Sequence, residues 1–499
     1  MNETGLLLIH PGGRELIYQD LGAQLAAVEP PLWCRLIAGY MLDRGWPVRI
    51  IDSEAENKSP EAIAEEVAKL RPRLCGVIVF GQQPSASTQQ MVAAGRLCRA
   101  IKALDPQRKI LIAGGHVSAL PERTLREEAV DFACNGEGPA TFHGLLEELS
   151  RRDPNFAGVP GLVWREDGEI RCNPAAPPIR DLDAELHGNV WHLLPMSRYR
   201  AHNWQCFGDL EARTPYASIY TSLGCPFRCT FCCINAPFGS NLYRMRSPAL
   251  VVEEIDHLYR VYGVKTFKII DEMFVLNDRH VTSICQALAA KPYAGELNLW
   301  AYARVDTVKA ERLELLRAAG IRWLALGIES GSAQVRDGAE KSFTRRDIFE
   351  VVRQIQRAGI RVIGNYIFGL PDDDMATMRE TLSLAKDLNC EFANFYSAMA
   401  YPGSALYREA MAAHRRLPAS WSGYSQHSYD CTPLGTDSVP AELVLRFRDE
   451  AFHEYFADPA YLEMVRREFG RETLQHIQAM TRVRLRRQLL DAADGGGKP

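Results

Sequence analysis

The sequence predicts an α/β protein with an N-terminal doubly wound domain, a second domain built as a β/α barrel, and a helical C-terminal extension. Short apolar runs alternate with longer amphipathic runs from Leu6 to about residue 150, and the alternation resumes at Tyr216. After about Arg415 it gives way to mixed aromatic and helical sequence. This alternation is typical of parallel sheets covered by helices. Because 499 residues exceed one ordinary core, we expect two or three domains.

The first domain, residues 1–150, is expected to be Rossmann-like. Its predicted strands are LLLIHP, VRIID, CGVIVFG and KILIAGG, and its predicted helices are PLWCRLIAGYMLDRGW, PEAIAEEVAKL and a segment near 86–104. Glycine-containing loops follow at 80–88, 113–122 and 135–140, where backbone can approach a ligand beyond the strand ends. No GxGxxG opens a helix, which argues against a dinucleotide site.

A connector, residues 151–210, separates the two domains. Its Pro-rich and Asp-rich stretches DGE, PAAPP and RDLDAELHGN interrupt the alternation and leave room for a small hairpin. Residues 211–412 then contain six strand–helix units, which predict a β/α barrel, complete or partial. Its helices are expected at 247–262, 277–290, 308–319, 344–358 and 373–388.

The extension, residues 413–499, contains the aromatic segment WSGYSQHSYDCTPLG at 421–435. Such a cluster could form a lid over a substrate, but packing of an added helical domain is the more common role and the one we expect. The side chains concerned are Trp421, Tyr424, His427, Tyr429 and Cys431.

Composition limits the possible partners. The net charge of −4 is spread without long runs of one sign, which argues against nucleic acid and anionic membranes and favours a small-molecule substrate. No apolar stretch reaches the roughly 20 residues that span a bilayer, and the start lacks a secretory signal, so we expect a cytoplasmic protein without membrane insertion. In reducing cytosol the 13 scattered cysteines should stay free thiols, which raises the question of metal ligation.

Three of these cysteines form the sharpest motif, GCPFRCTFCC. Cys225, Cys229 and Cys232 have CxxxCxxC spacing directly after the first strand of the second domain, where a tight loop can bring three thiolates together. Four cysteines complete a [4Fe–4S] cluster, so three leave one iron open for another ligand. A zinc knuckle is the alternative, but it needs a second Cys or His pair that the next forty residues lack. Cys233 is expected to point away from its neighbour Cys232 and to take no part in ligation.

With Phe231 as the aromatic before the last cysteine, this motif after the first barrel strand resembles the radical S-adenosylmethionine (SAM) superfamily, over residues of about 216–410. The resemblance implies a partial TIM barrel and a [4Fe–4S] cluster whose open iron chelates the amino and carboxylate groups of SAM. It also implies a 5′-deoxyadenosyl radical that abstracts hydrogen from substrate. The cofactors carry this chemistry, and an electron donor such as flavodoxin or ferredoxin would reduce the cluster.

Residues at the strand ends of a β/α barrel are the natural contacts for SAM. Asp271 and Glu272 occupy the place where the family hydrogen-bonds the methionine amino group, although the family's usual glycines are missing here. Arg304 follows the third strand and could pair with the methionine carboxylate through two hydrogen bonds.

The next two strand ends complete the predicted SAM site. Glu329 and Ser330 look like the family's ribose-contacting site, because a carboxylate can accept bonds from two sugar hydroxyls. The GLP sequence, from Gly369 to Pro371, would place backbone near the adenine. A loop charge or helix cap is the common role for any one of these residues. In strand order behind the cysteines, they together indicate a SAM pocket.

The GGxH and GEG loops of the first domain, ahead of such a barrel, resemble the cobalamin-binding radical SAM class over about 6–410. This class includes methyltransferases and the anaerobic magnesium-protoporphyrin ester cyclase. The DxHxxG signature that supplies a cobalt-binding histidine is absent, and we do not assign His116 to cobalt. A vestigial sheet that only docks on the barrel remains the alternative. The candidate cobalamin-binding positions are Ser85, Gly114, Gly115, His116, Gly136, Glu137 and Gly138.

From the resemblance we expect an enzyme that transfers a methyl group from SAM, through methylcobalamin, to a carbon or phosphorus centre of a small molecule. A cobalamin-dependent cyclase or rearrangement enzyme without methyl transfer is the nearest alternative. A non-catalytic iron–sulfur protein for electron transfer or sensing, and a zinc-binding interaction module, are alternatives from other classes.

Overall fold

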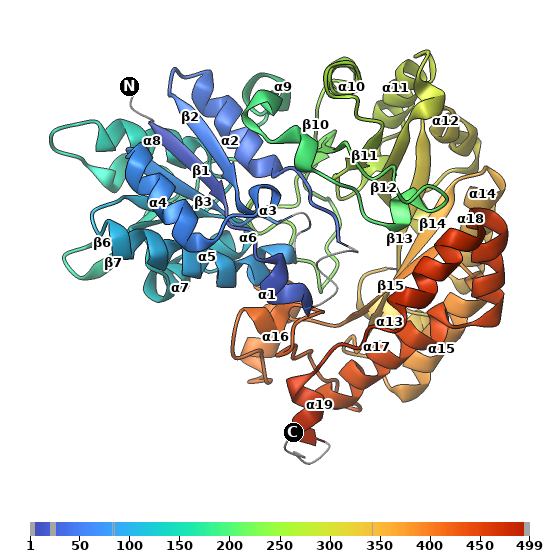
Figure 1. Ribbon diagram of the computed structural model, residues 1–499. Coiled ribbons are helices and arrows are strands. Elements are labelled where there is room, and N and C mark those ends of the chain that lie inside the picture. Colours follow the sequence, from blue (N-terminus) through green and yellow to red (C-terminus); the bar gives the residue numbers. More distant parts are fainter. Residues whose placement is uncertain (1–4, 20–25, 82, 84, 342, 494–499) are drawn as a thin grey trace.

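The computed structural model describes residues 5–19, 26–81, 83, 85–341 and 343–493. Two α/β units lie side by side, and the C-terminal helices pack against the second (Figure 1). The predicted tail DGGGKP lies outside the described residues.

The first unit is built on a seven-stranded sheet in the order β2-β1-β3-β4-β5-β6-β7. Its first five strands are parallel. The order 2-1-3-4-5 is a doubly wound topology whose ligand side lies beyond the carboxyl ends of the strands, where the order reverses between β1 and β3. The strands are β1 Leu6–His10, β2 Val48–Asp52, β3 Leu74–Ile78, β4 Ile110–Ala113, β5 Phe132–Cys134, β6 Leu162–Glu166 and β7 Glu169–Cys172.

The small hairpin expected in the connector is part of this sheet. Strands β6 and β7 pair antiparallel around an Asp-Gly turn, and β6 pairs antiparallel with β5, with Phe132 opposite Trp164. Burial of the apolar residues that begin β6 explains the pairing, since the short β5 would otherwise be an open edge. The sheet therefore continues to Cys172, past the expected boundary at residue 150.

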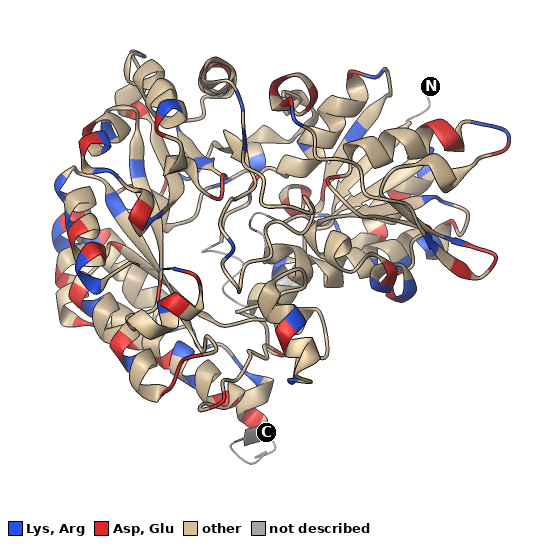
Figure 2. Cartoon of the chain, turned by 180° about the vertical axis from the view of Figure 1, so that it is seen from behind, with Lys and Arg blue, Asp and Glu red and all other residues tan. Residues whose placement is uncertain are grey.

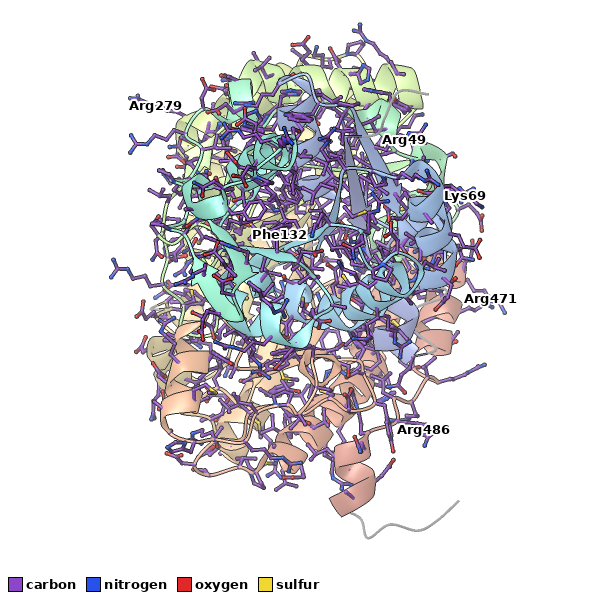
Figure 3. The ribbon with its side chains drawn as sticks, turned by 90° about the vertical axis from the view of Figure 1, so that its left-hand side faces the viewer. Arg49, Lys69, Phe132, Arg279, Arg471 and Arg486 are labelled. Atoms are coloured by element: carbon purple, nitrogen blue, oxygen red, sulfur yellow. The ribbon has the colours of Figure 1, made fainter. Side chains whose placement is uncertain are left out.

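Helices cover both faces of the first sheet (Figures 1 and 3). Figure 3 views this unit with Phe132 of β5 near the middle and with Arg49 and Lys69 of β2 and α4 toward one side. The loop expected at 113–122 is largely helical, because Pro121 starts a second short helix directly after the first. The helices are α1 Arg14–Tyr18, α2 Leu32–Leu42, α3 Ser53–Glu56, α4 Pro60–Leu70, α5 Ala86–Leu104, α6 Gly115–Ala119, α7 Pro121–Glu127 and α8 Pro139–Leu149.

The second unit contains six parallel strands in the order β8-β11-β12-β13-β14-β15. This sequential order is that of a partial barrel with β8 and β15 at its edges. The strands are β8 Tyr216–Ile219, β11 Thr266–Ile269, β12 Asn298–Arg304, β13 Ile321–Glu329, β14 Arg361–Phe368 and β15 Phe392–Ser397. A separate antiparallel pair, β9 Ser222–Leu223 and β10 Arg244–Met245, follows β8.

Four of the five helices predicted for the barrel begin within two residues of their expected positions. The helix expected at 308–319 is shorter, because residues 310–312 form a 3₁₀ turn before α12. The connector adds α9 Leu182–Glu185. The barrel helices are α10 Pro248–Tyr262, α11 Asp278–Ala289, α12 Leu313–Ala318, α13 Ala333–Gly338, α14 Arg345–Arg357 and α15 Met375–Leu388.

The C-terminal part is helical, as expected. Acidic and basic residues are interspersed along the outer helices of both units (Figure 2). None of the helices in the described part of the chain is long and apolar enough to cross a membrane. All 13 cysteines are free thiols. The helices are α16 Ala405–Ala412, α17 Ala441–Phe456, α18 Pro459–Met480 and α19 Gln488–Ala493.

A buried ionic cluster joins the two units. Arg35 of α2 donates to Glu254 of α10 (3.2 Å), and Arg246, next to β10, donates to the other oxygen of the same carboxylate (2.5 Å). The indole of Trp191 in the connector donates to Glu254 as well (3.0 Å), and all of these side chains are inaccessible to solvent or nearly so. Buried charges of this kind are stable only when every partner is present.

Candidate active site

The cysteine motif lies on the loop between β9 and β10, whose antiparallel pairing fixes both ends of the loop. Cys225, Cys229 and Cys232 are half-buried, and Asn235 Nδ2 donates to the carbonyl of Cys225 (3.0 Å). Burial raises the pKa of all three thiols, that of Cys225 to about 11. Metal ligation would therefore displace protons at neutral pH.

Within the described residues, no three His, Cys, Asp or Glu side chains converge on one point as ligands of a single ion. When three cysteines hold a [4Fe–4S] cluster, each thiolate binds a different iron, so the ligands stand further apart than those of a single ion. Cys233 is buried and lines a cavity between the two units.

Asp271, two residues after the end of β11, supports the start of the cysteine loop. It accepts hydrogen bonds from the backbone N–H and hydroxyl of Thr221 (2.6 and 2.5 Å) and from the Ser222 hydroxyl (2.6 Å). Both carboxylate oxygens are thus used within the protein, and Asp271 does not line the cavity.

Glu272 is placed differently from its neighbour. It lines the cavity, and its Oε2 atom is buried without a hydrogen-bond partner. Burial raises the pKa of this carboxyl to about 8. A buried acceptor without a donor is costly unless a ligand satisfies it, so Glu272 is suited to a cationic or N–H group brought in by a ligand.

Arg304, the last residue of β12, lies beside the cysteine loop. Its guanidinium pairs with the carboxylate of Asp306 through two hydrogen bonds (2.9 and 3.0 Å). It also donates to Cys229 Sγ (3.6 Å) and stacks over the ring of Phe227 at 3.8 Å. The guanidinium N–H groups that were expected to bind a ligand carboxylate are therefore bonded to Asp306, and the positive charge of Arg304 lies next to the sulfur of Cys229.

Glu329 and Ser330, at the end of β13, point to different surroundings. Glu329 has a left-handed backbone (φ 65°) at a β-bulge, forms a buried ion pair with Lys341, and lines the cavity. A non-glycine residue in this conformation is uncommon and is held by its surroundings. The Ser330 hydroxyl instead meets that of Thr381 (3.0 Å), away from the cavity.

The GLP sequence after β14 is not at the cavity. The amide of Gly369 donates to Asp373 (2.9 Å), and a Cβ at Gly369 would lie 2.6 Å from Val444 of α17. Pro371 is exposed. The close approach of α17 explains the glycine, which the sequence alone had suggested for an adenine contact.

A cavity of about 330 Å³ lies where the two units meet. The first unit contributes Phe80, Gly81 and Gly115, which follow β3 and β4 at the carboxyl edge of the sheet. The second contributes Phe231 and Cys232 from the cysteine loop, and the strand-end residues already described. The carboxyl ends of the strands in both sheets therefore face the same cavity.

The candidate residues of the first unit are divided between this cavity and structural roles. Ser85 and Gly115 line the cavity. His116 is buried, and its Nδ1 atom contacts Thr88 Oγ1 (3.2 Å) while its ring packs edge-on against Trp421 at 4.3 Å. Burial lowers the pKa of His116 to about 3, so the ring is neutral, and it does not line the cavity.

The GEG loop after β5 joins the two units. Glu137 pairs with Arg244 of β10 (2.5 Å) and accepts from the backbone of Ile179 (2.8 Å). Gly136 and Gly138 both have positive φ, which gives the loop the shape needed for this contact. The three residues of this loop are not among those that line the cavity.

We expect Gly114→Ala to destabilise the first unit by about 1–3 kcal/mol. Its Cβ would lie 2.4 Å from the carbonyl oxygen of Val79, which is held by backbone pairing between β3 and β4. Gly115→Ala is the matched control, because its nearest neighbour is a Ser87 atom at 3.5 Å. Urea unfolding should separate the two variants, and equal stability would contradict the packing described here.

Comparison with known proteins assigns these features to a family. Residues 18–146 match the B12 binding domain, and residues 219–385 match the Radical SAM superfamily. The chain is a cobalamin-binding radical SAM enzyme. The two matched families imply a [4Fe–4S] cluster, SAM and cobalamin as its cofactors.

Relatives of this radical SAM enzyme share most of its length. An uncharacterized methyltransferase of Pyrococcus horikoshii is 29% identical over 426 residues, which are 85% of this chain and 87% of the relative. The anaerobic magnesium-protoporphyrin IX monomethyl ester cyclase of Rubrivivax gelatinosus is 27% identical over 414 residues, covering 81% and 69%. The structure of the radical SAM methyltransferase TsrM from Kitasatospora setae, with cobalamin and a [4Fe–4S] cluster bound, has the same fold (TM-score 0.68, 20% identity, 91% and 89% coverage).

Several residues at the cavities of this radical SAM enzyme were not predicted. Lys341, the partner of Glu329, lies on the turn between α13 and α14 and carries no motif. The aromatic segment 421–435 packs as expected through Trp421 and Tyr424. Gln426 of the same segment lines the cavity between the two units. Arg487 fixes this stretch by donating to the carbonyl of Gln426 (2.9 Å). The two residues are 61 positions apart in the sequence, so no local pattern indicates the contact.

Proposed function

We propose that the enzyme methylates a small molecule, with SAM as the methyl source and cobalamin as the carrier. One observation carries the proposal: the cysteine loop, the strand ends of the barrel and the carboxyl edge of the B12-binding sheet open into the same cavity. Bound together there, the cofactors would supply the methyl group and the 5′-deoxyadenosyl radical. The protein would orient them and keep water out.

The residues present fit these groups. Cys225, Cys229 and Cys232 are the soft sulfur donors that an iron–sulfur cluster requires. The unpartnered Glu272 Oε2 would accept from the amino group of SAM, and Glu329, oriented by Lys341, would accept from the ribose. At Gly81 and Gly115 the cavity is lined by backbone alone, which would let cobalamin approach the chain closely. We propose a low-potential donor such as flavodoxin or ferredoxin as the electron source.

Methyl transfer can be tested before the substrate is known. The reconstituted enzyme is supplied anaerobically with cob(I)alamin and SAM carrying a trideuterated methyl group, and cobalamin is then examined by mass spectrometry. We expect labelled methylcobalamin in amounts that depend on the enzyme. Production of 5′-deoxyadenosine without any labelled methylcobalamin would instead favour ring closure or rearrangement, which the cyclase relative makes the second candidate.

Glu272→Gln is expected to weaken SAM binding by about 1.5–3 kcal/mol, because a neutral amide oxygen accepts a weaker hydrogen bond from the SAM amino group than a carboxylate does. In the wild type, the raised pKa of about 8 means that SAM binding must expel a proton at lower pH. SAM affinity should therefore rise with pH and level off near pH 8. Anaerobic equilibrium dialysis measures both effects, and an unchanged pH slope in the variant would contradict this role for Glu272.

A further inference from the structure

A second cavity, of about 310 Å³, lies inside the barrel next to the cofactor cavity. Strand residues line it, including Trp300 and Tyr302 of β12 and Asn394 and Tyr396 of β15. On the other side it is closed by residues of the B12-binding unit. The two cavities have four lining residues in common, namely Gln83, Tyr302, Asn365 and Tyr396.

The walls of this second cavity are flat and aromatic. Trp204, Trp300, Tyr302 and Tyr396 contribute rings from the barrel side. Tyr18 of α1 contributes one from the opposite side, stacked on His427 at 5.1 Å between ring centres. Aromatic walls of this kind favour a ligand with a flat apolar body, which gains both burial and ring stacking.

The basic side chains that line the second cavity are paired within the protein. Lys268 contacts Glu29 (3.2 Å), and Arg14 lies 3.5 Å from Glu54, although its Nε and Nη1 atoms are buried without a hydrogen-bond partner. Arg448 of α17 donates to Asp449 (2.8 Å). A charged ligand would have to compete with these pairs and lose its hydration, so the cavity favours an uncharged one.

Hydrogen-bond acceptors in the second cavity are left without donors. Gln90 of α5 is 8% exposed, its Nε2 group is used by His10 (3.0 Å), and its Oε1 atom is buried without a partner. Asp52 contacts the other ring nitrogen of His10 (3.1 Å), which fixes this orientation. His427 Nδ1 is likewise buried and unpartnered. Asn394 Nδ2 donates to Asn365 (2.9 Å), and the Oδ1 atom of Asn394 accepts no hydrogen bond from the described residues.

We propose that the second cavity binds the substrate, and that this substrate is an uncharged, flat molecule with N–H or O–H donors along one edge. The donors would satisfy Gln90 and Asn394, and the ring would lie against the aromatic walls. The atom to be modified would then lie beside Tyr302 and Tyr396, where the two cavities meet. The role of this ligand as methyl acceptor rests on the proposed function, whereas its binding does not.

Three bicyclic probes of similar size test the proposal. Quinolin-2-one is neutral and has an N–H donor, N-methylquinolin-2-one lacks the donor, and quinoline-2-carboxylate is an anion. Binding to the cofactor-loaded enzyme is measured by anaerobic equilibrium dialysis. We expect quinolin-2-one to bind about tenfold more tightly than either analogue. Equal binding of the N-methyl compound, or tighter binding of the carboxylate, would overturn the proposed ligand class.

Two variants locate the site. Gln90→Met keeps the side-chain length and removes the acceptor together with the bond to His10. Asn394→Leu removes the other acceptor, together with the bond to Asn365, from a half-buried position. Each should lower the affinity for quinolin-2-one about five- to tenfold and reduce its preference over the N-methyl compound. Gln478→Met, on the exposed face of α18, is the matched control and should change nothing.

The same variants distinguish this proposal from the proposed function. An unchanged affinity for quinolin-2-one in Asn394→Leu, with cobalamin and iron content equal to wild type, would overturn the site. If the probes behave as expected but no labelled methyl group reaches cobalamin, the methyl-transfer function fails and the binding site stands.

Discussion

Replacing Cys225, Cys229 and Cys232 together with alanine should abolish iron loading. The wild type, reconstituted anaerobically, is expected to hold about four iron and four sulfide ions per chain, and the triple variant close to none. Arg304, placed beside Cys229 at 3.6 Å, supports a negatively charged cluster but cannot replace a thiolate. Iron and sulfide analysis with visible absorption measures the outcome, and 5′-deoxyadenosine formation should fall with it.

The adjoining cysteine provides the control. Cys233 is buried next to the motif, and Cys233→Ala removes one sulfur at nearly the same place in the chain. It should load iron as the wild type does. Full iron loading and unchanged turnover in the triple variant would exclude the cluster assignment, and loss of iron in Cys233→Ala would show that the ligand set is wrong.

Glu254→Ala should be the most destabilising single substitution that we predict, at about 3–5 kcal/mol. The alanine would leave Arg35 and Arg246 as buried charges without their shared carboxylate, and would remove the acceptor for Trp191. Because these partners come from both units, the two should separate more easily. Urea denaturation followed by tryptophan fluorescence measures the loss of stability.

Glu253→Ala serves as the matched control, because Glu253 is the preceding residue of α10 and is exposed to solvent. Surface substitutions of this kind usually change stability by less than about 0.5 kcal/mol. Similar stability for the two alanine variants would mean that the buried cluster is not an important contact between the units.

The order of strands and helices along the chain could be predicted, because strand and helix periodicities are local properties of the sequence. Helices α5, α10 and α14 begin at or within one residue of their expected positions. The hairpin of β6 and β7 was expected only as part of a connector, because its pairing with β5 depends on an edge that local sequence does not reveal. The short helices α6 and α7 were missed because glycine and proline suggested a loop.

The site was harder to predict, because a strand end fixes where a residue lies but not what its side chain meets. Glu272 and Glu329 line the cavity, but Asp271 and Ser330, one position away, hydrogen-bond to the protein instead. Arg304 lines the cavity, but its guanidinium already forms two hydrogen bonds with Asp306. Alternate directions of neighbouring side chains at a strand end explain these differences.

The stretch around Gln426 and His427 has a consequence for how the enzyme can be divided. The first residue lines the cofactor cavity and the second lines the cavity inside the barrel, and Arg487 holds the stretch in place while pairing with Asp449 (2.8 Å). A chain cut at residue 385, where the second matched domain ends, would keep every cysteine of the motif and lose a wall of both chambers. Selectivity among enzymes with identical cofactors can therefore change in a region that carries no cofactor signature.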